Sequence, residues 1–299
     1  MGASVRGVSW RRSIGPAHAG VEAMRADLTM RDDCRWAVEG MDYVFMCAAS
    51  TSGAAVITSS PLVHVTPNAV MNAQLLDAAY AAGVKKVLFV SSGAAYPPTG
   101  ERPVAEDEMF AGDPSDVYFG AGWTKRYAEV LCRTYATKLA RPMPTVVVRP
   151  SNAYGPHDKF DFATSHVTAA LIRRVVERHR PLEVWGTGDD VRDLIYIDDL
   201  IDGMLCAFER DEPHVVVNLA SGRGYSVREI LKTLLDVDGY DDAEVSFDPS
   251  KPRTIPVRLF DTSYAKGELG FEAKIDLREG LRRTLRWYRE AGPRTGPQR

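Results

Sequence analysis

Short apolar runs alternate with longer stretches of helical periodicity through the first half of the chain. The apolar runs are bounded by polar residues and predict buried strands at residues 5–10, 43–47, 85–92 and 145–150. The stretches between them carry apolar residues at helical spacing and predict helices at residues 32–40, 68–82 and 118–138. This alternation favours strand–helix units over an all-helical or all-strand protein.

The predicted strands are apolar on both faces, which is typical of a parallel sheet covered on both sides. The sequence therefore predicts an α/β fold with a doubly wound, Rossmann-like parallel sheet. After Pro150 the loops lengthen and the elements shorten, up to a predicted helix at residues 277–290. We interpret residues 1–153 as a dinucleotide-binding domain and residues 154–299 as a smaller lobe that binds substrate.

The start of the chain lacks a feature that dinucleotide-binding sheets have. Such a sheet begins with a strand, a glycine-rich turn and a helix, and no G-x-G-x-x-G or relative of it occurs here. Residues 5–10 resemble the second strand instead, followed by Arg11 and Arg12 where a ribose or 2′-phosphate is read, and Asp27 and Leu28 resemble the adenine-side turn. A strand–helix unit of ~30 residues is expected to be missing.

Loss of that unit has a physical consequence, because the first strand of this topology lies at the centre of the sheet. Its absence predicts two unpaired strand edges inside the domain. Three explanations stay open: a start of translation further upstream, a natural truncation, or a short form that no longer holds a dinucleotide.

Composition and charge exclude several classes of protein. Lys and Arg total 37 against 40 Asp and Glu, a formal net charge of -3, so nothing draws the chain toward nucleic acid. The four cysteines are far apart, which fits neither a disulfide framework nor a zinc site, and no metal is expected. No apolar stretch reaches the ~18 residues of a membrane span, and no signal peptide is recognisable, so we expect a cytoplasmic protein.

Two serines and a tyrosine are candidates for chemistry. Ser91 and Ser92 end a predicted strand, and Tyr118 opens a predicted helix. Ligands bind at the carboxyl ends of the strands in such sheets, and a serine and a tyrosine facing one site can polarise a carbonyl and give it a proton. Serines at strand ends and tyrosines at helix starts are also common without any function.

Several motifs together resemble one family over nearly the whole chain. In order they are CAAS, residues 68–97, DVYFG, VVVRPSNAYGPHD, WGTGDDVRDLIYIDDL and VNLASG. They resemble the extended short-chain dehydrogenases/reductases, the NAD-dependent epimerase/dehydratase family, which act on nucleotide sugars. AYGPHDKF, SHVTAALIRR and FDPSKPRTIPVRLFD look most like the GDP-L-fucose synthase group, and next like the GDP-mannose 3,5-epimerases.

The resemblance implies roles for particular residues. Tyr118 would be the acid/base, Ser91 would flank the sugar C4 oxygen, and His166 would move a proton beside the ketone. The implied cofactor-binding residues are Arg11, Arg12, Asp27, Leu28, Ala48, Ala49, Asn68, Phe89, Ser91, Ser92, Tyr118, Pro150, Asn152 and Ala153. The implied substrate-binding residues are Ser92, Asn152, His166, Arg174, Trp185, Arg192 and Arg258. Arginines suit a diphosphate because a guanidinium pairs with two phosphate oxygens at once.

Two departures from the family pattern concern the reacting groups. The family has Tyr-x-x-x-Lys, and counting from Tyr118 the lysine position holds Gly122; Lys125 lies about two helical turns from Tyr118. Fucose synthases also carry a cysteine two residues after the catalytic serine, and counting from Ser91 that position is Gly93. Both departures would weaken proton and hydride transfer.

We therefore expect a nucleotide-sugar epimerase/reductase that acts at or next to C4 of a GDP-linked hexose. Its cofactor would be NADP, favoured by Arg11 and Arg12, with NAD as the alternative. The alternative function is a catalytically impaired relative that binds a nucleotide sugar without turnover. A 4-epimerase or 4,6-dehydratase also stays open as a question of substrate. The resemblance implies a homodimer.

Overall fold

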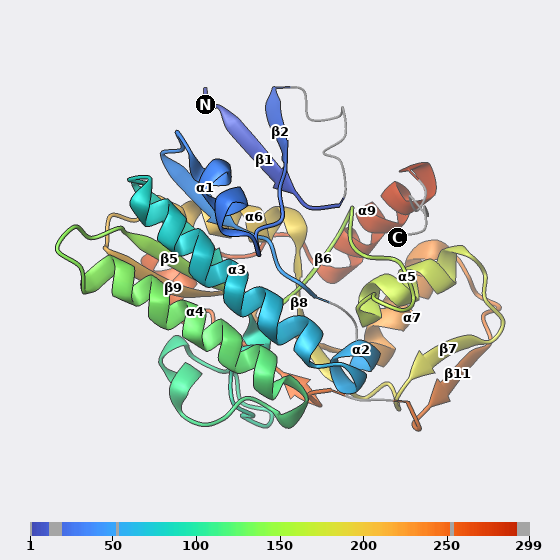
Figure 1. The fold of residues 1–299 in the computed structure, drawn as a ribbon. Helices are drawn as coiled ribbons and strands as arrows, with labels where there is room; N and C mark the ends of the chain where they lie inside the picture. Colours follow the sequence, from blue (N-terminus) through green and yellow to red (C-terminus); the bar gives the residue numbers. More distant parts are fainter. Residues whose placement is uncertain (1, 12–19, 52–53, 252–253, 292–299) are drawn as a thin grey trace.

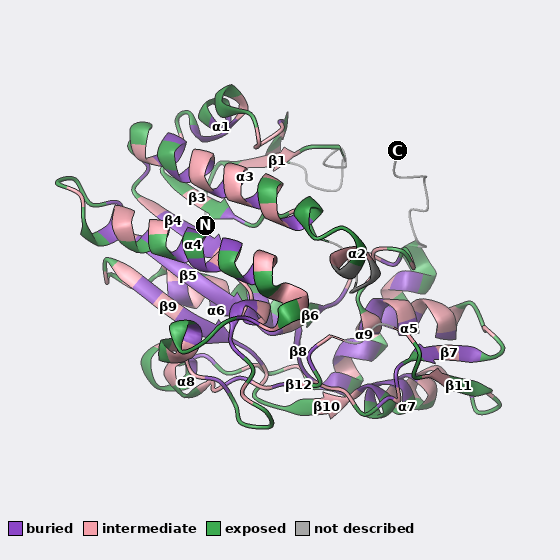
Figure 2. Ribbon diagram, turned by 60° about the horizontal axis from the view of Figure 1, so that its bottom comes forward, coloured by how far each residue is buried: buried purple, intermediate pink, exposed green. Residues whose placement is uncertain are grey.

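Parallel strands form the centre of the N-terminal part in the computed structural model, which describes residues 2–11, 20–51, 54–251 and 254–291. One sheet holds four strands in the order β3, β4, β5, β9, and all its pairs are parallel. Their bounds are β3 (Tyr43–Met46), β4 (Lys86–Val90), β5 (Thr145–Pro150) and β9 (His214–Leu219). Figure 2 shows β4 and β5 buried along most of their length, as their continuous apolar runs predict.

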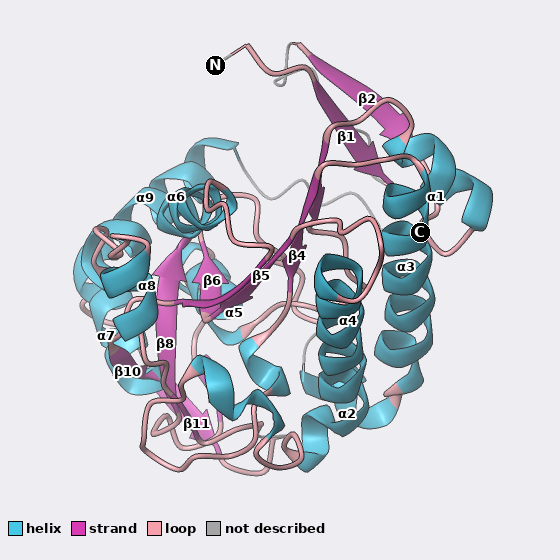
Figure 3. Cartoon of the chain, turned by 90° about the vertical axis from the view of Figure 1, so that its left-hand side faces the viewer, coloured by secondary structure: helices cyan, strands magenta, loops and turns pink. Residues whose placement is uncertain are grey.

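Helices cover both faces of this sheet (Figures 1 and 3). One face carries α1 (Arg31–Val38), α3 (Leu62–Ala81) and α4 (Phe119–Thr137), and the other carries α6 (Ile197–Phe208). Val87 and Phe89 of β4 pack with the first group, and Leu88 between them packs with α6. This alternation confirms the doubly wound α/β fold that the sequence predicts.

Two further strands stand apart from the four-stranded sheet. β1 (Val5–Ser9) pairs in parallel with β2 (Val21–Arg25), and the pair forms a sheet of its own. Among the described residues, no strand pairs with the second edge of β1 or with the second edge of β3. The sequence predicts such a pair of open edges where the first strand of the fold would lie.

The C-terminal lobe is built around β8 and three helices. β8 (Val191–Tyr196) pairs with β6 (Asn152–Tyr154), β10 (Gly224–Ser226) and β12 (Val257–Arg258), and β7 (Leu182–Trp185) pairs with β11 (Val245–Asp248). The helices that share its apolar core are α5 (Val167–Val176), α7 (Val227–Asp238) and α9 (Leu277–Ala291). α6 and β9 follow residue 154 but join the N-terminal sheet, and Ala265 and Phe271 pack against the same sheet further along the chain.

The remaining elements are short. They are α2 (Ala54–Ser59), α8 (Ser263–Glu268) and three single-turn helices, η1 (Gly93–Ala95), η2 (Glu106–Phe110) and η3 (Asp116–Tyr118). None of the helices in the described ranges is both long enough and apolar enough to span a membrane. Those same ranges contain no cluster of three or more His, Cys, Asp or Glu side chains suited to a metal.

Candidate active site

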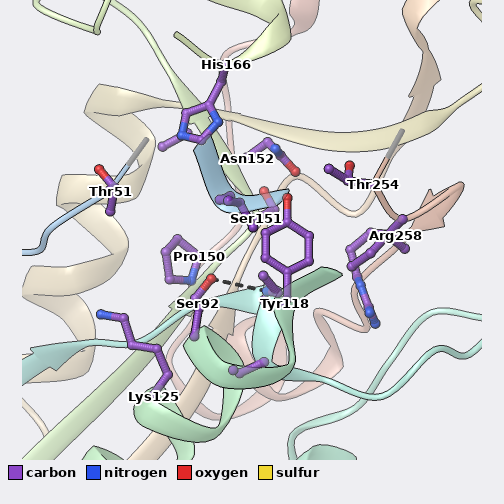
Figure 4. Close-up of a pocket in the computed structure, with 18 of the residues that line it drawn as sticks. Thr51, Ser92, Tyr118, Lys125, Pro150, Ser151, Asn152, His166, Thr254 and Arg258 are labelled. Atoms are coloured by element: carbon purple, nitrogen blue, oxygen red, sulfur yellow. Dashed lines mark hydrogen bonds between the residues drawn. The ribbon is translucent and has the colours of Figure 1, made fainter. Parts of the chain in front are cut away.

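A pocket of about 320 Å³ opens where the strands of the larger sheet end. The loops after β3, β4 and β5 line its floor, the start of α4 forms one wall, and β8 and β12 of the C-terminal lobe form another (Figure 4). The carboxyl edge of a parallel sheet is where ligands bind in this architecture. The predicted site residues that line it are Ala49, Asn68, Ser92, Tyr118, Pro150, Asn152, Ala153, His166, Arg192 and Arg258.

The two adjacent serines at the end of β4 face different surroundings. Ser91 is buried and donates a hydrogen bond to the carboxylate of Glu129, which pairs with Arg149 at 2.6 Å beneath the pocket. Ser92 lines the pocket, and its hydroxyl accepts a hydrogen bond from the backbone N–H of Ala94 at 3.1 Å. Ser92, and not Ser91, therefore faces the pocket, because successive side chains of a strand point to opposite faces.

Lys125 lies in the pocket, although the family count from Tyr118 puts the lysine position at Gly122. Its ammonium donates to the carbonyl of Val90 at 2.7 Å and lies 4.7 Å from the centre of the Phe89 ring. Burial of this ammonium lowers the pKa of Lys125 to about 8, against a partial opposing effect of Glu129. Lys125 therefore provides a cation at the carboxyl edge of the sheet, although position 122 holds a glycine.

Counting four residues back from Lys125 gives Ala121, which also lines the pocket. The Tyr-x-x-x-Lys spacing is therefore interrupted at the tyrosine and not at the lysine. Gly122 has no room for a side chain, because a Cβ there would lie 2.6 Å from Cγ of Pro114. Starting the count from the lysine of AGWTK would have found this arrangement in the sequence.

Tyr118 reaches the pocket from the residue just before α4. Figure 4 shows its ring between Ser92 and Arg258, with Lys125 on the far side of Ser92. The phenol lies close enough to Arg258 to oppose, in part, the burial that lowers the pKa of that guanidinium to about 10. Ser92 and Tyr118 therefore line the same pocket, and the sequence predicts that Tyr118 faces such a site together with a serine.

The position expected for a second acid/base group is occupied by small residues. A Cβ at Gly93 would lie 2.1 Å from Cζ of Phe260, so a side chain there requires this ring to move. Counting from Ser92 instead of Ser91, the position two residues on is Ala94, which lines the pocket. Neither residue can transfer a proton.

His166 lines the pocket together with Asp158, a residue that the motif analysis did not single out. The surrounding protein desolvates both groups, which lowers the pKa of His166 and raises the pKa of Asp158. The charge of Asp158 partly opposes the fall in the pKa of His166, and the charge of His166 partly opposes the rise in the pKa of Asp158. An imidazole and a carboxyl group beside each other can pass a proton to or from a bound ligand.

Two arginines bring positive charge from the C-terminal lobe. Arg192 of β8 and Arg258 of β12 are neighbours across a strand pair, and both are buried. Arg258 donates to the carbonyls of Pro97 and Tyr96, and its buried Nε has no hydrogen-bond partner within the described parts of the chain. Paired guanidinium groups in a pocket suit an anion such as a diphosphate.

Asn68 fixes the loop after β3 to α3. Its amide nitrogen donates to the carbonyls of Ser50 and His64, at 2.9 and 2.6 Å, and its oxygen accepts from the N–H of Ser50 at 2.8 Å. Each hydrogen of its amide group is therefore used within the protein. Asn68 therefore positions the pocket wall formed by the loop after β3.

Other predicted residues lie away from the pocket. Phe89 is buried in the core, and Ala48 precedes the lining residue Ala49. Arg174 stacks on the ring of Phe162, at 4.6 Å, and Trp185 is 38% exposed on β7.

The adenine-side residues lie near the ends of β1 and β2. Arg11 packs over Trp10 at 3.8 Å, Asp27 accepts hydrogen bonds from Thr29, and Leu28 packs against the core beside α1. Arg12 lies outside the described residues.

The doubly wound sheet and the pocket at its carboxyl edge define an α/β enzyme class, and comparison with known proteins identifies the family. Residues 2–220 match the family described as "NAD dependent epimerase/dehydratase family". The chain belongs to this family, and it is thereby an NAD(P)-dependent enzyme of the nucleotide-sugar epimerase/reductase class. The resemblance found in its motifs is confirmed.

Individual relatives agree with this assignment. The chain is 30% identical over 273 residues to "Probable GDP-L-fucose synthase 1" of Oryza sativa subsp. japonica, covering 88% of this chain and 81% of the relative. It is 28% identical to "GDP-mannose 3,5-epimerase 1" of the same organism, covering 88% and 69%. The structure of UDP-glucose 4-epimerase from Thermotoga maritima superposes with a TM-score of 0.85 at 27% identity, over 97% of this chain and 92% of that chain.

Proposed function

We propose that the chain reduces or epimerises a GDP-linked hexose at or next to C4, with NADP as its cofactor. The observation that carries this proposal is the convergence of Ser92, Tyr118, His166 and two arginines on one pocket at the carboxyl edge of the sheet. The names of the relatives, GDP-L-fucose synthase and GDP-mannose 3,5-epimerase, support the choice of a GDP-sugar.

The residues of the pocket divide into a reacting end and an anion end. Ser92 and Tyr118 would hold the C4 oxygen, with Tyr118 giving it a proton when a ketone is reduced. His166 would exchange a proton at a carbon beside the ketone. Arg192 and Arg258 would hold the diphosphate, and Arg174 and Trp185 stay predictions for the nucleoside end.

The carboxyl ends of β4 and β5 fit the nicotinamide end of a dinucleotide. Ser92, Pro150 and Asn152 border the pocket there, and the Lys125 ammonium lies beside them. A nicotinamide held at this edge would supply or accept the hydride. The pyrophosphate is assigned to no residue, because no strand near the start of the sequence is followed by a G-x-G-x-x-G turn.

NADP is favoured over NAD by the two arginines after β1. Arg11 is exposed at that strand's carboxyl end, and Arg12 follows it in the sequence. A 2′-phosphate placed at that end of β1 would meet the positive charge of Arg11.

The function is tested by measuring the turnover of a GDP-4-keto-6-deoxyhexose through the loss of NADPH absorbance. Tyr118→Phe removes only a hydroxyl and should lower kcat by about 10²–10⁴-fold with little change in KM. Tyr43→Phe is the matched control, because this tyrosine lies exposed on β3 and does not line the pocket.

Three outcomes would contradict parts of the proposal. Full turnover by Tyr118→Phe would remove Tyr118 from the reaction. If adding Ala121→Tyr restored turnover to Tyr118→Phe, a tyrosine at position 121, four residues before Lys125, would be able to replace Tyr118 as the proton donor. Binding of the GDP-sugar by the unaltered chain without any turnover would support a protein that holds the nucleotide sugar and does not reduce it.

We further propose a homodimer formed through α3 and α4. Both helices expose large apolar side chains, and those of α4 recur on one face of that helix. The exposed residues are Leu62, Val63, Phe119, Trp123, Tyr127 and Val130. Trp123→Glu should convert a dimer to a monomer in light scattering after size-exclusion chromatography, and a monomeric unaltered chain would contradict this proposal.

A further inference from the structure

Two oppositely charged side chains of α4 contact the end of β4. The Lys125 ammonium donates to the carbonyl of Val90 at 2.7 Å, and the Glu129 carboxylate accepts a hydrogen bond from the hydroxyl of Ser91. Residues four apart on a helix lie one turn apart on the same face. Because these two side chains also bind consecutive residues of β4, the ammonium and the carboxylate lie beside each other where this strand ends.

The carboxylate of Glu129 is fixed in place through both of its oxygens. Arg149 of β5 donates from Nε to Oε1 at 3.1 Å and from Nη2 to Oε2 at 2.6 Å. Each side chain of this pair is 4% exposed. Arg149 also donates to the hydroxyl of Tyr96 and to the carbonyl of Glu106. The carboxylate therefore holds one position relative to Lys125, and a positive charge on β5 lies next to it.

Glu129 also carries the negative charge in the surroundings of the Lys125 ammonium. The titratable groups that act on this ammonium are Glu129 and Cys132 on α4 and Cys47 after β3, and β4 adds the ring of Phe89 at 4.7 Å. Burial raises the pKa of both thiols, so both are uncharged at neutral pH. Among these groups the carboxylate is therefore the one that attracts the ammonium.

We propose that Glu129 is a positioning residue for Lys125, and that its carboxylate keeps the Lys125 ammonium charged at the end of β4. Burial alone favours the neutral amine, and the adjacent carboxylate opposes part of the resulting fall in the pKa of Lys125. Lys125 and Ser92 line the same pocket (Figure 4). A cation there would stabilise negative charge that develops during proton transfer.

The effect of Glu129 on the charge of Lys125 does not depend on the proposed function. Only its consequence for turnover rests on that function. The two can therefore be measured separately.

The arrangement predicts shifts of opposite sign when either half of the buried pair is neutralised. Glu129→Gln removes the negative charge and leaves that of Arg149, so the Lys125 ammonium should lose its proton at lower pH. Arg149→Gln removes the positive charge and leaves that of Glu129, so the proton should be kept to higher pH. Both variants break the same contacts between α4 and β5. A purely structural effect would therefore act in the same direction in both.

NMR titration of the protein labelled with ¹³C in its lysines measures the charge of Lys125 directly. The resonance that is missing from the spectrum of Lys125→Met identifies this residue. Its titration midpoint should fall by at least about 0.5 pH in Glu129→Gln and rise by at least about 0.3 pH in Arg149→Gln. Lys85, which is exposed and paired with Asp42, is the internal control and should titrate equally in all forms.

A conservative variant separates charge from packing at the same position. Glu129→Asp keeps a carboxylate and should hold the midpoint of Lys125 closer to that of the unaltered chain than Glu129→Gln does. Each variant tests the proposal by itself, because each has its own predicted sign, so the test stands if one of them does not fold.

The pH profile of kcat/KM extends the test to turnover. For the reduction of a GDP-4-keto-6-deoxyhexose, the fall in activity at high pH should move to lower pH in Glu129→Gln and to higher pH in Arg149→Gln. Equal loss of activity at every pH, with no movement of the profile, would mean that the pair only supports the fold.

Two NMR results would overturn the proposal. They are an unchanged midpoint of Lys125 in both variants, and shifts in the same direction in both. If the midpoints move as expected but the unaltered chain turns over no GDP-sugar, the proposed function fails and the role of Glu129 toward Lys125 is supported.

Discussion

The N-terminal region contains two arginine–glutamate pairs in very different surroundings, one beneath the pocket and one between β1 and β2. Arg149 and Glu129 lie beneath the pocket, each with 4% of its side chain exposed, and Ser91 and Tyr96 complete their hydrogen bonds. Arg6 of β1 and Glu22 of β2 pair at 3.0 Å, but the glutamate is 58% exposed. The Arg149–Glu129 pair is enclosed on both sides, whereas in the β1–β2 pair the glutamate stays in water and only 17% of the Arg6 side chain is exposed. Loss of the glutamate should therefore cost much less at β1–β2.

Removal of each glutamate should give the largest contrast between the two regions. Glu129→Ala leaves a buried guanidinium without its partner and should cost about 3–5 kcal/mol of unfolding free energy. Glu22→Ala should cost only about 0–1 kcal/mol, because water replaces an exposed partner. Urea unfolding of the two variants measures both values. Equal losses would mean that the β1–β2 pair is enclosed after all.

Lys125 sharpens the comparison through pH, because only the covered region encloses a lone ammonium. Its pKa of about 8 lies below the unfolded value of 10.5, so between these pH values the unfolded chain binds more protons. Stability from this group therefore rises as pH increases through that window, by up to about 3 kcal/mol, and is lost as pH falls again. Lys125→Met should remove the rise in urea unfolding measured at several pH values.

The control for this experiment is Lys85→Met. That ammonium is fully exposed, and its hydrogen bond with Asp42 holds the pKa of Lys85 above its usual range. The control variant should therefore keep the rise across the window. If Lys125→Met kept the rise as well, another group would be responsible for it.

The strands and the location of the site could be predicted from the sequence, because an apolar run such as residues 86–90 has few alternatives to a buried strand. The choice between Ser91 and Ser92 could not, since it depends on which face each side chain meets where β4 ends. The lysine was assigned to Gly122 because the count began at Tyr118. A count back from Lys125 would have pointed to Ala121, and the fold shows that both residues line the pocket.

The substrate lobe was harder to predict, for a related reason. Arg192 and Arg258 come from strands far apart in the sequence that pair only in the folded chain. Arg174 lies on α5, and the periodicity of that helix predicts which of its faces is buried but not which residues pack against it. In the fold, the Arg174 guanidinium stacks on the ring of Phe162. The motif resemblance implied these arginines as substrate-binding residues, but the residues that each of them meets in the fold leave no local signal in the sequence.

Packing at the start of α4 gives the smallest expected effect and bears on the same wall of the pocket. A Cβ at Gly122 would approach Cγ and Cβ of Pro114 to 2.6 and 2.7 Å, so Gly122→Ala should cost about 1–3 kcal/mol despite the better helix propensity of alanine. Gly267→Ala in α8 meets nothing within 4 Å and should be neutral or stabilising by up to about 1 kcal/mol. Thermal unfolding compares the two directly. A stabilising Gly122→Ala would show that the turn carrying Pro114 yields, and a lysine at 122 would then be possible.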